Sequence, residues 1–192
     1  KFKKIFRKSI SCRENSCVFL FLGRIKKEKG IFQIFEIFKK FENKFHNAEL
    51  WIVGPDEENL KYELMNSFNF KIPKVRWFDF TPDPQKFIKS SDILLLPSFR
   101  EGFGNVIIEA ASCAVPAIAY DIHGVRDAII NSQTGILIKD QNINSFAEGL
   151  VDLFNNKVKR KKMGKNAQNR VLKKFTSKLI SKAWYNEYSK YL

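Results

Sequence analysis

Short, almost continuously apolar runs alternate along this chain with segments that have helical periodicity. The run "CVFLFLG" at 17–23 contains no charged residue. The segment that follows repeats apolar side chains at the spacing of one helix face, at Ile31, Ile34, Phe35, Phe38, Phe41 and Phe45. A strand that is covered by helices on both faces of a sheet reads as such a continuous apolar run. The alternation therefore predicts an α/β fold with a parallel sheet.

The same alternation continues to about residue 140. Further strands are predicted at 48–54, 74–80, 92–98, 115–120 and 136–139, and further helices at 56–68, 84–91, 105–114 and 124–131. After Asp140 only helices are predicted, at about 143–156, 158–174 and 177–191. We therefore expect a single doubly wound Rossmann-like domain with about six parallel strands and C-terminal helices.

The chain begins with a basic segment followed by an apolar one, which is also the order in a signal peptide. Because the apolar run leads into "GRIKKEKG" without a small-residue cleavage site, we interpret it as a buried strand. We expect 1–16 to be a basic leader or inter-domain segment, 17–175 the Rossmann-like domain, and 176–192 a separate C-terminal helix. No apolar run approaches the roughly 18 residues that a membrane span needs.

Three cysteines, Cys12, Cys17 and Cys113, lack the spacing of metal ligands. Cys17 and Cys113 lie in apolar runs, which predicts buried free thiols and favours a reducing cytoplasm. The sequence indicates no metal site.

The net charge of +14 is unevenly distributed. Residues 157–182 hold eleven Lys or Arg and no acid, and residues 1–13 hold six more. Such a stripe is typical of a solvated helix face, of a surface that contacts an anionic membrane, or of a nucleic-acid binder. Because the basic stretch lacks interleaved aromatic residues and any known nucleic-acid motif, we expect no nucleic-acid partner.

Ligands of doubly wound sheets bind at the carboxyl ends of the strands, so the residues after each strand are candidates. Arg24 and Lys29, after the first strand, form either a solvated basic turn or a pair that meets two phosphates. Phe80, after the third strand, is either a core side chain or a platform on which a nucleobase stacks.

The segment "REGFGNVIIEA" at 100–110 follows the fourth strand and carries two glutamates around a glycine pair. Gly102 and Gly104 would let the backbone approach an anion at the N-terminus of the next helix. Glu109 lies among apolar residues of that helix and is either solvated or an acceptor for the two hydroxyls of a ribose. The first β–α turn lacks G-x-G-x-x-G and the chain lacks a Walker loop, so neither phosphate-binding fingerprint is present.

Taken in order, "GR…EKG", "EGFGNVIIEA" with its E-x7-E spacing, and "TGILI" resemble the C-terminal domain of retaining glycosyltransferases of the GT-B fold, glycosyltransferase family 4. The resemblance covers nearly the whole chain from Cys17 onwards. It departs from the family at "DIHGVRDAI", where a single Gly124 and Asp127 replace a glycine pair followed by Pro-Glu. An accessory donor contact at that position is therefore in doubt.

The resemblance implies a divided donor site. Arg24 and Lys29 would bind the diphosphate, Glu101 the sugar hydroxyls, and Glu109 the ribose, with Glu101, Arg24 and Lys29 acting in catalysis. The loop at Asp79, Phe80 and Thr81 would contact the base. The backbone around the loops would hold sugar and phosphate, at Gly23, Gly102, Phe103, Gly104, Asn105 and Val106.

The resemblance also implies a function. We expect transfer of a sugar from a UDP- or GDP-linked donor, with UDP favoured, to a saccharide or lipid-linked acceptor in bacterial surface polysaccharide or glycolipid synthesis. No further cofactor and no metal are implied. The family's N-terminal Rossmann domain, which supplies most of the acceptor site, would be a partner absent from this chain. We expect a cytoplasmic protein with peripheral contact to an anionic membrane. A non-catalytic nucleotide- or partner-binding module is the alternative.

Overall fold

The computed structural model describes residues 1–68 and 74–191 and places six strands in one sheet. The strands are β1 (Cys17–Leu22), β2 (Ala48–Val53), β3 (Lys74–Phe78), β4 (Ile93–Leu96), β5 (Ala117–Tyr120) and β6 (Gly135–Ile138). All neighbours pair in parallel, in the order β3-β2-β1-β4-β5-β6. The strand order reverses between β1 and β4, as in a doubly wound Rossmann sheet. The predicted fold is confirmed.

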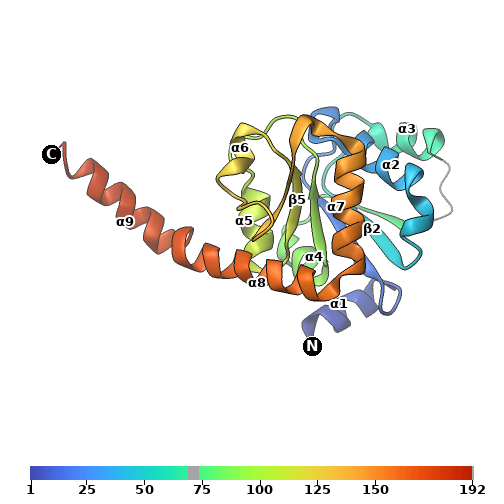
Figure 1. The fold of residues 1–192 in the computed structure, drawn as a ribbon, viewed down its shortest axis with the longest axis horizontal. Coiled ribbons are helices and arrows are strands. Elements are labelled where there is room, and N and C mark those ends of the chain that lie inside the picture. Colours follow the sequence, from blue (N-terminus) through green and yellow to red (C-terminus); the bar gives the residue numbers. More distant parts are fainter. Residues whose placement is uncertain (69–73, 192) are drawn as a thin grey trace.

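Helices cover both faces of the sheet, and the last one leaves the body of the molecule (Figure 1). One face carries α2 (Ile31–Lys40), α3 (Leu60–Ser67) and α7 (Ile143–Asn155). The other carries α1 (Phe2–Ser9), α4 (Pro84–Ser90), α5 (Asn105–Ser112) and α6 (His123–Arg126). The helix α8 (Lys157–Lys174) packs on α5, and α9 (Ser177–Tyr188) projects away with no buried residue.

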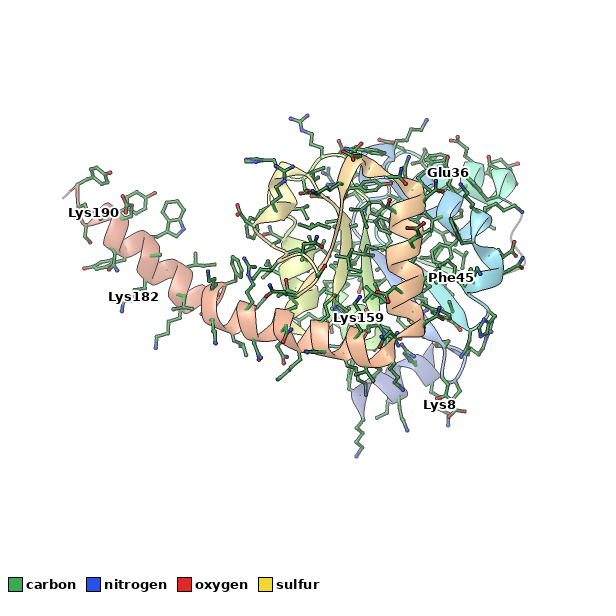
Figure 2. All side chains as sticks on the ribbon, in the orientation of Figure 1. Lys8, Glu36, Phe45, Lys159, Lys182 and Lys190 are labelled. Atoms are coloured by element: carbon green, nitrogen blue, oxygen red, sulfur yellow. The ribbon has the colours of Figure 1, made fainter. Side chains whose placement is uncertain are left out.

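The strands are buried on both faces because successive side chains enter opposite cores. In β1, Phe19 and Phe21 join the core beneath α2 and α7, whereas Val18 and Leu20 join the core beneath α4 and α5. Phenylalanines of distant segments meet in the first core, where the Phe19 ring lies 5.4 Å from both Phe38 and Phe45. In Figure 2 the labelled Phe45 lies within the body, whereas Lys182 lies on the projecting α9 and Lys190 just beyond its end. This packing accounts for the continuous apolar runs in the sequence.

Several elements are shorter than predicted. The helix after β2 begins at Leu60 and not at 56, because the Asp56 carboxylate accepts hydrogen bonds from the backbone N–H groups of Leu60 and Lys61, both at 2.9 Å. The predicted helix start is therefore four residues too early. Cys17 is buried as expected, whereas Cys113, at the end of α5, is only half-buried, so that part of the prediction is wrong.

The basic N-terminal segment forms a helix that docks on the domain. The Phe6 ring packs edge-on against Trp51 and Phe87, with centroid distances of 6.4 and 5.2 Å. Lys3 Nζ and Arg7 Nη2 bind the two carboxylate oxygens of Asp92, at 2.7 and 2.6 Å. The sequence did not predict α1, because most of its partners, such as Trp51, Phe87 and Asp92, lie more than 40 residues away along the chain.

A second acid holds the segment that links α1 to β1. Glu49, which is fully buried near the start of β2, accepts hydrogen bonds from the backbone N–H of Arg13 at 2.6 Å and from Arg76 Nε at 2.7 Å. Trp51 Nε1 donates a third at 3.1 Å. The Arg76 guanidinium also donates to the carbonyl oxygens of Ile10 and Ser11. The leader is thus fixed at the amino edge of the sheet, opposite the strand ends where ligands are expected.

Within the described ranges, no helix is both long and apolar enough to cross a membrane.

Candidate functional site

A cleft of about 470 Å³ opens at the carboxyl ends of the strands, beside the point where the strand order reverses. The turns after β1, β2 and β3 form its walls, together with the first two turns of α5. Twelve residues line it: Leu22, Gly23, Arg24, Val53, Gly54, Pro55, Glu57, Phe80, Thr81, Pro84, Val106 and Glu109. Six of the predicted site residues are therefore brought together in one cleft, namely Gly23, Arg24, Phe80, Thr81, Val106 and Glu109.

The cleft floor depends on close contact between two turns. Gly54 has φ +141°, and a Cβ at this position would lie 2.0 Å from the carbonyl oxygen of Gly23. Both glycines follow directly on buried strands, β1 and β2. A side chain at Gly54 would therefore separate the two turns and displace Arg24.

Arg24 is half-exposed in the cleft, and its Nη1 lies 3.6 Å from a carboxylate oxygen of Glu57. Lys26 Nζ lies 2.7 Å from the same oxygen, and its hydrogen bond holds the pKa of the Glu57 carboxyl below its ordinary value. Glu57 lines the cleft but is not among the residues predicted from the sequence. Its position just after a buried strand, at the same edge as Arg24, was the available signal.

Phe80 lies on the loop after β3 and is 74% exposed while lining the cleft. The alternative in which it is a core side chain is therefore wrong. An exposed ring at the edge of a cleft can stack on a planar ligand. Thr81 lines the cleft beside it, whereas Asp79 does not.

Glu109 faces the cleft from the second turn of α5, where its neighbours are apolar or small. Partial burial raises the pKa of its carboxyl. Among the described residues no cation forms an ion pair with it. A carboxylate in this position can accept hydrogen bonds from a ligand that carries neighbouring hydroxyls.

Lys29 and Glu101 form an ion pair, and neither residue lines the cleft. Lys29 Nζ lies 2.9 Å from Glu101 Oε1, and the side chains are only 17% and 14% exposed. The turn that carries Lys29 packs against the loop that carries Glu101: Phe99 N–H donates to the Glu28 carbonyl at 2.9 Å. Gly30, with φ +73°, allows this approach, since a Cβ there would lie 2.0 Å from the Pro97 carbonyl oxygen. The structure thus pairs two of the three predicted catalytic residues, Lys29 and Glu101, with each other.

The loop from Glu101 to Gly104, here called the glycine loop, leads into α5. Gly104 has φ +69° and is the N-cap residue of α5, without a side-chain cap. The first N–H groups of a helix lack partners within the helix, so they can receive an anion. Gly102, Phe103 and Asn105 are exposed. The glycine loop therefore borders the cleft without lining it.

Gly124, in α6, packs directly against the backbone of the glycine loop. A Cβ at Gly124 would lie 2.0 Å from the Glu101 carbonyl oxygen and 2.6 Å from that of Gly102. In the sequence, Gly124 is distinguished only as a departure from the family pattern. Only the structure shows that α6 lies directly against the loop backbone.

No group of three or more His, Cys, Asp or Glu side chains that could hold a metal ion occurs in 1–68 and 74–191. Among the lining residues the cation is Arg24, and Lys26 binds Glu57 beside it.

Comparisons with known proteins agree with this architecture. The family model "Glycosyl transferases group 1" matches residues 2–170. A capsular polysaccharide biosynthesis glycosyltransferase of Staphylococcus aureus, CapM, is 33% identical over 173 residues, which are 90% of this chain and 46% of CapM. The UDP-Gal:alpha-D-GlcNAc-diphosphoundecaprenol alpha-1,3-galactosyltransferase of Escherichia coli is 30% identical over 172 residues, which are 88% of this chain and 44% of that enzyme.

A solved structure extends the comparison to three dimensions. An S. aureus TarM variant, crystallised with fondaparinux, alpha-GlcNAc-glycerol and UDP, superimposes with a TM-score of 0.81 at 25% identity. The superposition covers 91% of this chain and 36% of TarM. The chain spans about half the length of the curated relatives that it matches, and its sheet is the Rossmann-like C-terminal domain of a GT-B fold. This chain belongs to the group 1 glycosyl transferases.

Proposed function

We propose that this chain is the donor-binding half of a retaining glycosyltransferase of family 4, and that the donor is a UDP-sugar. The observation that carries the proposal is the cleft, which combines a cation (Arg24), an exposed ring (Phe80) and a carboxylate (Glu109) beside the switch point of the sheet. A nucleoside diphosphate offers the matching groups, namely an anion, a planar base and a ribose diol. The E. coli relative is named for UDP-Gal as its donor, and TarM was solved with UDP, which supports uridine over guanosine.

The roles follow from chemistry and position. Phe80 stacks on the base with Thr81 and Asp79 on the same loop, and Glu109 accepts hydrogen bonds from the ribose hydroxyls. Arg24 binds the diphosphate with its planar fork. The glycine loop, with the first amides of α5 at Asn105 and Val106, receives phosphate and sugar oxygens. The cations and the helix N-terminus stabilise the negative charge of the departing diphosphate, without a metal or further cofactor.

Lys29 and Glu101 act as a pair in this proposal. In the free protein each compensates the charge of the other in a largely buried position. A bound donor gives each a new partner: the Lys29 ammonium binds diphosphate, and the Glu101 carboxylate accepts hydrogen bonds from the sugar hydroxyls. Glu101, Lys29 and Arg24 are then the groups that contact the reacting part of the donor.

We expect this chain by itself to bind the donor and to transfer little sugar, because it spans only about half the length of its relatives. The remainder would supply the site for a saccharide or lipid-linked acceptor. Two of the named relatives act in capsular polysaccharide and diphosphoundecaprenol-linked glycan synthesis, and we assign this protein to bacterial surface polysaccharide or glycolipid synthesis. The projecting α9, with exposed Trp184, Tyr185 and Tyr188, would pack towards the other half.

The proposal is tested with Glu109→Ala and UDP. We expect UDP to bind the wild-type chain, and the substitution to weaken binding by about five- to fiftyfold, because two hydrogen bonds to an ionised acceptor are lost. Titration calorimetry with UDP and GDP measures both the effect and the preference for the base.

Since protonation removes acceptor capacity from a carboxylate, the wild-type affinity should also decrease as the pH falls through the raised pKa of Glu109.

The matched control is Glu148→Ala, which changes an exposed glutamate on α7 outside the cleft. It should bind UDP as the wild-type chain does. Equal affinity of Glu109→Ala and wild type would contradict the ribose role, and binding of nucleotide without any transfer by the complete protein would favour the alternative of a non-catalytic module. Efficient acceptor glycosylation by this chain alone would contradict its assignment as a donor half.

We also propose cytoplasmic activity with peripheral contact to an anionic membrane. Lysines without ion-pair partners among the described residues project from α8 and the start of α9, at Lys157, Lys161, Lys162, Lys173, Lys174, Lys178 and Lys182. Val158 and Leu172 are exposed among them. Each cation near an anionic surface contributes about 1 kcal/mol. Co-sedimentation with vesicles containing phosphatidylglycerol, but not with neutral phosphatidylcholine vesicles, is expected at low salt. Equal behaviour with both would argue that the stripe is only a solvated helix face.

A further inference from the structure

The side chain between the two glycines of the glycine loop is held by the end of α8. The Phe103 ring packs against Phe175, with centroids 5.8 Å apart and planes inclined by 57°. Phe175 is the C-cap residue of α8 and directly precedes Thr176, the N-cap of α9. A residue more than 70 positions further along the chain thus contacts the glycine loop.

A second side chain, that of Arg170, also contacts the Phe175 ring. The Arg170 guanidinium lies 4.8 Å from the centroid of the Phe175 ring, at the distance of a cation–π contact. Arg170 also donates to the carbonyl oxygens of Asp127 and Ala128, at 2.6 and 3.1 Å. Arg170 therefore links Phe175 to the turn after α6.

These contacts form a continuous series that begins and ends at the glycine loop. The loop backbone rests on Gly124 in α6, the turn after α6 binds Arg170, and Arg170 holds Phe175. Phe175 returns to the loop through Phe103. Beneath it, Ala111 of α5 packs against Ala167 and Val171 of α8, which fixes the two helices relative to each other.

We infer that Phe175 is a positioning residue for the glycine loop. A Cβ at Gly102 would have no neighbour within 4 Å, so no other group packs on that side of the loop. Glycines also leave the backbone free to sample many conformations. Phe103 is the one side chain between the glycines, and its contact with Phe175 restricts them both. A loop that is ordered before binding loses less conformational entropy when it receives the donor. The inference rests on the proposed function in assigning the donor to this loop.

The experiment measures loop order and donor binding separately in Phe175→Ala. Backbone ¹⁵N order parameters of Gly102, Phe103 and Gly104 in the free protein should fall from the rigid range near about 0.85 to below about 0.6. The dissociation constant for UDP should rise about three- to tenfold, which corresponds to the loss of one aromatic pair. Phe175→Tyr keeps the ring and should restore both values.

Met163→Ala is the matched control, because it removes buried apolar volume from α8 without touching Phe103 or Phe175. It should lower the free energy of unfolding but leave the order parameters and the UDP affinity unchanged. Unchanged order parameters in Phe175→Ala overturn the inference, as does a loss of order that leaves UDP binding by a binding-competent wild type unaltered. A loss of order in a chain whose wild type binds no UDP would instead refute the proposed function and leave the positioning of the loop intact.

Discussion

Gly124→Ala is expected to displace the glycine loop and to weaken UDP binding by at least about tenfold. The added Cβ would lie 2.0 Å from the Glu101 carbonyl oxygen and 2.6 Å from that of Gly102, and both are backbone atoms that cannot rotate away. Accommodation of such a clash costs about 1–3 kcal/mol of stability. It also moves the groups that we assign to the sugar and the diphosphate. Thermal denaturation and UDP calorimetry on the same samples measure the two effects.

Gly164→Ala separates loop displacement from general destabilisation. Gly164 lies in α8, and a Cβ there would approach the Ala114 carbonyl oxygen to 2.1 Å, at the end of α5 remote from the cleft. This variant should lose comparable stability and keep its UDP affinity. If Gly124→Ala binds UDP as well as Gly164→Ala does, the glycine loop does not hold the donor.

Glu49→Leu is expected to lower the free energy of unfolding by about 3–5 kcal/mol, because it leaves the largely buried Arg76 without its carboxylate. It also removes an acceptor from the backbone N–H of Arg13 and from Trp51 Nε1. Urea denaturation monitored by tryptophan fluorescence measures the change. The conservative Glu49→Gln keeps an acceptor oxygen and should lose less.

The pH dependence of stability gives a second measurement for Glu49. Burial favours a raised pKa, but the hydrogen bonds from Arg13 N–H, Trp51 and Arg76 outweigh it and hold the pKa of Glu49 below its ordinary value. The stabilisation is therefore complete above the ordinary glutamate pKa and is lost as the pH falls towards the lowered one. Glu49→Gln should flatten this acidic decline, whereas Glu148→Gln, at an exposed position, should not. An unchanged decline in Glu49→Gln would show that other carboxylates dominate, with Asp92 the next candidate because its pKa is also lowered.

Much of the fold follows from local patterns. Buried strands such as β1 and β2 contain apolar side chains on both faces, so each is visible as a run within a few residues of sequence. The helix boundaries are less accurate, as at α3, because a single carboxylate such as Asp56 decides where the first turn begins. The basic leader shows the limit of local patterns: α1 contains only one aromatic side chain that enters the core, Phe6, and its ion-pair partner Asp92 is distant in sequence.

In the candidate site, too, some features follow from local sequence and others depend on tertiary contacts. Each predicted side chain was found by its position after a strand, and the structure brings Arg24, Phe80 and Glu109 to one cleft. Strand order then decides which turns are neighbours, and it pairs Lys29 with Glu101 while bringing Glu57 to Arg24. Glu57 and Gly124 were not recognised, because their importance lies in contacts with other turns and not in their own local sequence.

The doubly wound sheet, and the turns that carry polar groups, could be predicted from the sequence, since both depend on patterns within single elements. The folded protein was needed to show which of those groups meet, that α1 belongs to the domain, and that Phe175 contacts the glycine loop. These contacts join segments tens of residues apart. Such pairings depend on how the strands are ordered and how the helices pack. Neither can be predicted from a short stretch of sequence.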